Sequence, residues 1–210
     1  MKIISLELYG IIPVNAYICY DEKTMCGVII DPGAEVERIL SALKKENIKI
    51  EKILLTHGHF DHIGAALALS EAVGAPICMG EGGAEYAKNP QANLSTSTGR
   101  EIVLPHVTEL KAGEIVPLEN APTVKLSVIS TPGHTADGTT YYATDYKVAF
   151  VGDTIFAGSY GRTDFYGGDE NILLTSIKEK ILALPEGTVL LSGHSEPTTV
   201  AAEKARPWYR

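Results

Sequence analysis

Four apolar, strand-like runs in this chain end in the same way, with a short turn and then a histidine or an aspartate. His57 follows "KILLT", His134 follows "LSVISTPG", Asp153 follows "VAFVG" and His194 follows "VLLSG". In α/β proteins, functional side chains gather at the carboxyl ends of strands. We therefore expect a fold that brings these four strand ends, which are far apart in the sequence, to one crevice.

The order of the predicted elements indicates two similar halves, each with strands first and then strand and helix. Apolar runs bounded by Gly, Pro, Asn or Asp predict strands, and apolar residues at helical spacing predict helices. In the first half these patterns predict strands at 3–10, 15–22 and 26–33, a helix at 35–48, a strand at 50–56, a helix at 63–73, a strand at 75–79 and a short helix at 83–87. The first three strands are expected to form an antiparallel meander.

The second half is separated from the first by a long irregular stretch, residues 89–113, of the kind that often forms a binding loop or a lid. After it, the same patterns predict strands at 123–130, 139–144 and 147–152, a helix at 169–184 and a strand at 188–193. No linker rich in Pro, Gly or Ser lies between the halves, and the two halves show no alignable sequence repeat. We predict a single domain over residues 1–210, in which two sheets pack together and helices lie outside.

The stretch "THGHFDHIG" contains the densest cluster of polar residues that could bind a metal: His57, His59, Asp61 and His62. Imidazole nitrogens and a carboxylate suit zinc, iron or manganese, whereas calcium requires oxygen ligands. A lone histidine beside glycine is usually only a turn residue, and the stretch alone would also fit one mononuclear site. The further candidates at three other strand ends favour a larger site.

The seven candidate ligands can be divided between two ions. Each ion would then keep a position for water, and two neighbouring cations would lower the pKa of a shared water toward neutrality. In this division one site is His57, His59 and His134, the other is Asp61, His62 and His194, and Asp153 bridges the two.

The motifs "THGHFDH", "GHT", "GDTIF" and "SGH" resemble those of the metallo-β-lactamase superfamily in order and spacing, over essentially the whole chain. The segments "GDTIFAGSYGRTDFYGGDE" and "GHSEPTT" are similar to those of short, single-domain, glyoxalase II-like hydrolases. The resemblance implies a four-layer αββα sandwich, the ligand allocation given above, and two divalent ions. Zinc is the expected metal, with iron and manganese as alternatives.

The same resemblance implies a thioester hydrolase of the hydroxyacylglutathione type, in which a metal-bridging hydroxide held by Asp153 attacks the carbonyl and Asp61 helps to orient the water. The glutathione-binding C-terminal helical domain of full-length glyoxalase II is not expected, because only 16 residues follow His194. One alternative is a mononuclear iron persulfide dioxygenase, since those enzymes carry a "GRTDF"-like segment. Another is a metal-binding protein without catalysis, which an intact seven-ligand set disfavours.

Tyr160 and Arg162 lie where related hydrolases place a contact for a substrate carboxylate, and Arg162 could bind one bidentately. The alternative is that Arg162 pairs with Asp164 or Asp169 and braces its own loop. Thr135 and Thr154 follow ligands directly and are expected to hydrogen-bond to them.

Departures from the family pattern lie near the expected metals. Asp137 stands where related proteins often have glycine, and Ser195 and Glu196 stand where they commonly have Gly-Pro. None of these removes a ligand, but each could alter the shape of the pocket. They leave the identity of the substrate open.

The charge of the chain restricts its partners. A net charge of −8 and scattered Lys and Arg residues oppose binding to nucleic acid. No apolar run is long enough for a membrane helix, and no signal peptide is recognisable, so we expect a cytoplasmic protein with a small-molecule substrate.

The three cysteines and the sixth histidine are not expected to take part in the metal site. Cys19, Cys26 and Cys78 have no metal-binding spacing and are expected to be buried, reduced thiols. His106 is expected in an exposed loop. The sequence does not predict the oligomeric state.

Overall fold

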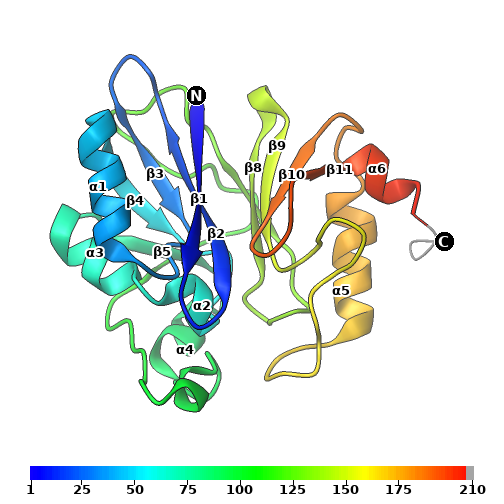
Figure 1. Cartoon of the computed structure of the whole chain (residues 1–210). Coiled ribbons are helices and arrows are strands. Elements are labelled where there is room, and N and C mark those ends of the chain that lie inside the picture. The colour runs from blue at the N-terminus through cyan, green and yellow to red at the C-terminus, as the bar shows by residue number, and fades with distance from the viewer. Residues whose placement is uncertain (207–210) are drawn as a thin grey trace.

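Residues 1–206, which the computed structural model describes, form two β-sheets that face each other, with helices on the outer side of each (Figure 1). Within this range the first sheet has the strand order β1–β2–β3–β4–β5–β6, and the second has the order β11–β10–β9–β8–β7. Both sheets are mixed, because parallel and antiparallel pairs occur in each. Two facing sheets with helices outside agree with the arrangement expected from the sequence.

The first sheet begins with the predicted antiparallel meander and continues with parallel strands. Its strands are β1 (Lys2–Tyr9), β2 (Pro13–Tyr20), β3 (Cys26–Ile30), β4 (Lys49–Leu54), β5 (Ile77–Gly80) and β6 (Thr108–Leu110). The second sheet contains β7 (Ser127–Ser130), β8 (Thr139–Ala143), β9 (Val148–Gly152), β10 (Val189–Ser192) and β11 (Thr198–Thr199).

The helices connect these strands and cover the outer faces. They are α1 (Val36–Glu46), α2 (Phe60–Ile63), α3 (Ala66–Val73), α4 (Gly83–Lys88), α5 (Glu170–Ser176) and α6 (Val200–Lys204), with short 3₁₀ turns η1 (Ser95–Thr98) and η2 (Thr144–Tyr146). A π-helical turn, η3 (Ile177–Ile181), continues α5. In the described part of the chain no helix is both long enough and apolar enough to cross a bilayer.

Three layers of apolar side chains join these elements. Ile39 of α1 and Leu69 of α3 pack against the outer face of the first sheet. Tyr17 and Phe150 meet between the two sheets, with ring centroids 5.3 Å apart, and Leu173 of α5 packs on the outer face of the second sheet. The result is a four-layer αββα sandwich.

Some predicted boundaries were wrong. The helix expected at 63–73 is two pieces, α2 and α3, because the N–H of Ala65 donates to the carbonyl oxygen of Pro32 (2.9 Å) instead of continuing the helix. The irregular stretch 89–113 contains η1 and strand β6. The elements β11 and α6 were not predicted, since a two-residue strand and a five-residue helix leave little periodic pattern.

The interpretations of the cysteines and of His106 are confirmed. Cys19, Cys26 and Cys78 are free and buried, whereas His106 is exposed.

Candidate metal centre

The strand ends singled out in the sequence meet at one place. His57 lies three residues beyond Leu54, the last residue of β4, and Asp153 directly follows β9. His134 and His194 lie in the loops after β7 and β10. His59 precedes the short helix α2, which carries Asp61 and His62.

The first group of facing side chains is His57, His59 and His134, whose candidate ligand atoms lie within 4.8 Å of one another. Nδ1 of His59 and Nε2 of His134 are 2.9 Å apart. Nε2 of His57 is buried and has no hydrogen-bond partner among the described residues. Nε2 of His59 is likewise buried and without a partner among these residues, and such unpaired, buried ring nitrogens fit a shared cation.

The second group is Asp61, His62 and His194, which satisfies the same 4.8 Å limit. Nε2 of His62 is 3.2 Å from Nε2 of His194, and Nε2 of His194 is 3.1 Å from Oδ2 of Asp61. Two nitrogens and a carboxylate oxygen therefore face one point, as in a zinc, iron or manganese site.

Asp153 lies between the two groups. Its Oδ1 is 3.3 Å from Nε2 of His62, and its Oδ2 is 3.3 Å from Nε2 of His194 and 3.7 Å from Nε2 of His134. One carboxylate thus contacts histidines of both groups. The structure brings together all seven predicted side chains, in the same two groups that the sequence suggested.

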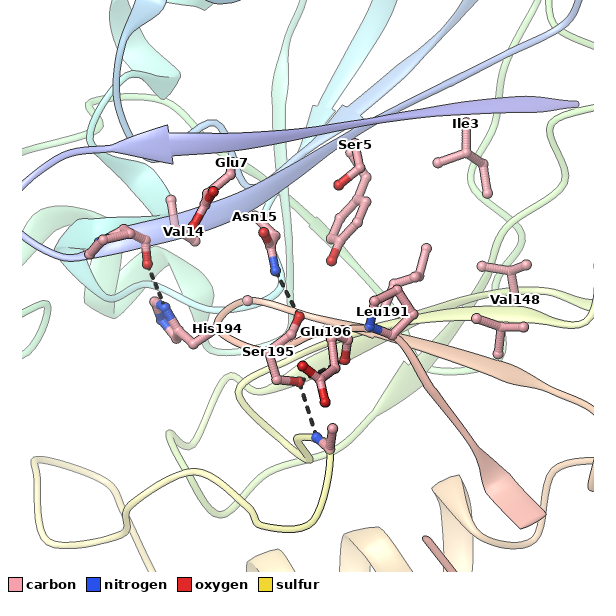
Figure 2. A pocket seen from close by; sticks show the side chains of 16 residues that line it. Ile3, Ser5, Glu7, Val14, Asn15, Val148, Leu191, His194, Ser195 and Glu196 are labelled. Carbon is pink, nitrogen blue, oxygen red and sulfur yellow. Dashed lines mark hydrogen bonds between the residues drawn. The ribbon is translucent and has the colours of Figure 1, made fainter. Parts of the chain in front are cut away.

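The second ring nitrogen of four of these histidines is held by a hydrogen bond, and for His57 it is Nδ1, 3.2 Å from the hydroxyl oxygen of Thr56. Nδ1 of His62 donates to Oδ2 of Asp31 (2.9 Å), and Nδ1 of His134 donates to the carbonyl oxygen of Arg162 (2.7 Å). Nδ1 of His194 donates to the carbonyl oxygen of Pro13 at 2.7 Å (Figure 2). In a neutral imidazole this arrangement leaves the lone pair on Nε2, which faces the centre.

Asp31 is a functional residue that the sequence reasoning missed. Besides holding His62, its carboxylate accepts hydrogen bonds from the backbone N–H of Thr56 (2.8 Å) and from its hydroxyl (2.7 Å). A signal was present, because Asp31 directly follows the apolar run of β3, as Asp153 follows β9. The role expected of Thr154 was wrong, since its hydroxyl donates to Thr131 (3.2 Å) rather than to a ligand.

The two groups differ in their electrostatics. Burial, together with the neighbouring imidazoles, lowers the pKa of His57 well below its ordinary value and lowers the pKa of His59 to about 3. Burial also opposes the charge on His194, but hydrogen bonds with Asp153 and Asp61 outweigh it and raise the pKa of His194 to about 10. Asp153 and the other carboxylates likewise raise the pKa of His62 well above its ordinary value, against burial.

A cavity of about 610 Å³ opens beside the centre. Ligand candidates form its floor, and Arg162 lies in its wall, but the guanidinium of Arg162 makes two 2.6 Å hydrogen bonds to the carboxylate of Asp164. The local pairing considered as the alternative for Arg162 is therefore present. Tyr160 does not line this cavity, and its hydroxyl donates to Glu170 (2.8 Å).

Two of the departures from the family pattern, Ser195 and Asp137, differ in their surroundings. Figure 2 shows a second cavity, of about 800 Å³, which His194 and Ser195 line together with residues of β1 and β2. The hydroxyl of Ser195 accepts a hydrogen bond from the N–H of Ala157 (3.0 Å), in the loop after Asp153. Asp137 is almost fully buried, and burial raises its pKa to about 7.

An αββα sandwich with a buried cluster of His and Asp side chains at its strand ends defines a protein of the metallo-β-lactamase fold whose centre can bind metal ions. The family model described as "Metallo-beta-lactamase superfamily" matches residues 9–194. The chain belongs to the metallo-β-lactamase superfamily.

Two curated relatives are similar over nearly their whole length. The hydroxyacylglutathione hydrolase GloC of Haemophilus influenzae is 35% identical over 206 residues, which cover 92% of this chain and 93% of that protein. The probable metallo-hydrolase YqgX of Bacillus subtilis is 36% identical over 198 residues, covering 93% of this chain and 91% of that protein.

Solved structures give the same picture. The B3 metallo-β-lactamase BLEG-1 has a TM-score of 0.91 and 37% identity, covering 99% of each chain. TTHA1623 in a di-iron-bound form has a TM-score of 0.84 and 31% identity, covering 98% of this chain and 99% of that one. ETHE1 from Myxococcus xanthus has a TM-score of 0.78 and 27% identity, covering 98% of this chain and 83% of that one.

Proposed function

We propose that this protein is a metal-dependent hydrolase that binds two divalent ions and cleaves thioesters of small molecules. The observation that carries the proposal is the position of Asp153, whose carboxylate lies within 3.7 Å of histidines from both groups. A carboxylate that contacts both groups suits a dinuclear centre better than two independent sites. The 35% identity to a protein named hydroxyacylglutathione hydrolase supports the thioester as substrate.

When bound, the two ions would activate a water molecule and polarise the substrate carbonyl. The first group would hold one ion, the second group the other, and Asp153 both. Asp61 lies next to His194 and lines the cavity, which supports the proposal that it helps to orient a water. Apart from the ligand candidates, the titratable residue in the described lining is Arg162. This suits a thiolate leaving group, which needs little protonation.

The test pairs elemental analysis with a thioester panel that includes S-lactoylglutathione. We expect two ions per chain and turnover of at least one thioester. Asp153→Asn should lower both the metal content and kcat/KM by at least about tenfold, whereas Asp145→Asn, which alters an exposed residue, should change neither. Full metal content and activity in Asp153→Asn would refute the dinuclear assignment.

A mononuclear iron persulfide dioxygenase is the second candidate, favoured by the 27% identity to ETHE1 over 98% of this chain. The three histidines of the first group could hold a single ion without the second group. One iron per chain, with oxygen uptake on glutathione persulfide and no thioesterase activity, would establish this function instead. We propose zinc as the native metal, with iron and manganese as alternatives that the same elemental analysis distinguishes.

A further inference from the structure

The cavity above the metal centre is lined by Ser97, Arg162 and five apolar side chains, besides the candidate ligands. The apolar side chains come from four separate segments: Ile12 in the β1–β2 turn, Phe60 at the start of α2, Leu94 before η1, and Phe156 and Phe165 in the loop after β9. We call these five residues the apolar wall. Phe60 lies between His59 and Asp61 in the chain, so the wall begins at the candidate ligands themselves.

The cavity offers little to an anionic ligand. Among its described lining residues, Arg162 is the one Lys or Arg, and its charge is already balanced by Asp164 through two hydrogen bonds. The same guanidinium lies 4.0 Å from the ring centroid of Phe165, which adds a cation–π contact. A ligand carboxylate would have to displace Asp164 in order to pair with Arg162.

The backbone conformation of Leu94 is unusual for a leucine. Its φ is 65°, in the left-handed region, which glycine or asparagine adopts more readily than leucine. The neighbouring residue Asn93 holds this part of the chain: its side-chain amide donates to the carbonyls of Tyr86 (3.0 Å) and Ile102 (2.9 Å). The carbonyl of Asn93 accepts from the N–H of Phe60 (2.9 Å).

These contacts keep Leu94 next to Phe60 despite the backbone strain. The left-handed backbone disfavours leucine at this position. The presence of leucine therefore points to a role for its side chain, which lines the cavity. The irregular segment is thus attached at Phe60, beside the candidate ligands, and contributes an apolar side chain to the substrate side.

We propose that the apolar wall binds the apolar acyl group of a thioester, and that Leu94 determines which acyl length is preferred. The proposal rests on the thioester hydrolase function proposed above. A thioester carbonyl placed at the centre has two substituents, the acyl chain and the thiol. Both substituents are bonded to the carbonyl carbon, and we assign the acyl chain to the wall because an alkyl chain suits its apolar side chains, whereas the glutathione of a glutathione thioester carries charges. Each buried CH₂ should then increase kcat/KM about fourfold until the wall is covered.

The first experiment uses the full chain loaded with zinc and the N-acetylcysteamine thioesters of acetic, butyric and hexanoic acids. We expect kcat/KM to rise about fourfold per added CH₂, and to change less when the thiol is exchanged for glutathione at constant acyl group. Hydrolysis that is insensitive to the acyl chain, or that depends on the thiol instead, would overturn the role of the wall. If no thioester is hydrolysed, the proposed function itself fails.

The second experiment replaces Leu94. Leu94→Gly removes the side chain and relieves the left-handed backbone, so we expect an unchanged or higher Tm together with a weaker dependence on acyl length. Leu94→Asn should behave alike, because asparagine tolerates this conformation. The matched control is Lys147→Gly, at an exposed residue with φ 52°, which should keep the acyl-length dependence. Unchanged selectivity in both Leu94 variants would overturn the assignment.

A third readout does not depend on turnover. Alkyl ketone analogues of the thioesters, with CH₂ in place of sulfur, can be titrated calorimetrically into the metal-free protein. Their affinity should rise about fourfold per CH₂ of the acyl chain, and Leu94→Gly should reduce that increment. An affinity that is independent of chain length in the unsubstituted protein would contradict the proposal.

Discussion

At the scale of single residues, the centre depends on groups that do not face the metal. Asp31 connects His62 with Thr56, the residue before His57, so one carboxylate orients parts of both groups. The backbone carbonyls of Pro13 and Arg162 orient His194 and His134 by accepting hydrogen bonds from their Nδ1 atoms. A substitution removes a side chain but not a backbone carbonyl. Of these three residues, Asp31 is therefore the one whose contact with a ligand can be tested by mutation.

Asp31→Asn should weaken metal binding at the second group about 10-fold to 100-fold, because the hydrogen bond that fixes the tautomer of His62 is altered. The measurement is a metal titration followed by calorimetry. Asp145→Asn, at an exposed residue outside the cluster, is the control and should leave both affinities unchanged. Equal affinities in Asp31→Asn and the unsubstituted protein would remove Asp31 from the centre.

The pKa values predict different proton release by the two groups. In the metal-free chain His62 and His194 are protonated at neutral pH, because their pKa values are raised, to about 10 for His194. His57 and His59 are neutral there, since their pKa values are lowered. A metal ion must displace the protons, so lower pH should weaken the second group first, by about tenfold per pH unit for each proton.

Calorimetric titrations in buffers of different ionisation enthalpy measure this release directly. The expected result is about two protons released on filling the second group and about none from His57 and His59 on filling the first. Between pH 8 and pH 6 the ion of the second group should be lost first. Equal proton release in both steps would contradict the prediction.

The seven candidate ligands were predictable because each lies at a strand end or in a dense cluster, which is a local pattern. Asp31 has the same position after β3, but "DPG" also has the composition of an ordinary turn. The position of Leu94 in the cavity lining could not be predicted. An irregular segment has no periodic pattern of apolar residues that would indicate which side chains face the protein.

At the scale of elements, the end of β9 lies very close to the segment that follows β4 in the other sheet. Gly152 ends β9 with φ 50°, directly before Asp153, and a Cβ there would lie 2.3 Å from the hydroxyl oxygen of Thr56. Thr56 is in turn bonded to Asp31. The two sheets therefore touch immediately behind the centre, at a residue without a side chain.

Gly152→Ala should destabilise the protein by about 2 to 4 kcal/mol, through overpacking and the left-handed backbone together. Gly187→Ala is the matched control, because no atom lies within 4 Å of its Cβ position and its φ is outside the left-handed region. It should be neutral or slightly stabilising. Urea denaturation measures both, and similar midpoints for the two variants would refute this account.

Elements were predictable where a run was long enough to show its period. The helix α1 and the strands β1 to β3 were found for this reason, whereas β6 has three residues of which two are exposed. The end of α2 coincides with a hydrogen bond from Ala65 to the carbonyl oxygen of Pro32, which is distant in the sequence. Such boundaries arise from packing, not from local preference.

At the scale of the whole molecule, the core between the sheets holds the two halves of the ligand set in register. Phe150 is fully buried there and contacts Tyr17 of the opposite sheet. The first sheet carries the elements that lead to the THGHFDHIG stretch, and the second carries those that lead to His134, Asp153 and His194. The centre therefore exists only when the two sheets are packed.

Phe150→Ala should lower the free energy of unfolding by about 3 to 5 kcal/mol, because it leaves a cavity between the sheets. The control, Ile115→Ala, changes an apolar residue that is 59% exposed and should cost no more than about 0.5 kcal/mol. Chemical denaturation measures the free energy of unfolding of both variants. A loss in Phe150→Ala no larger than in the control would show that this layer does not hold the sheets together.

The ligand set also spans the chain. His62 and His194, whose ring nitrogens lie 3.2 Å apart, are separated by 132 positions in the sequence. A loop of that length must close before both can coordinate one ion, so coordination through this pair belongs to the late part of folding. Interactions that form after the folding barrier slow unfolding without accelerating folding. Bound metal should therefore extend the lifetime of the native chain and leave the time needed to reach it unchanged.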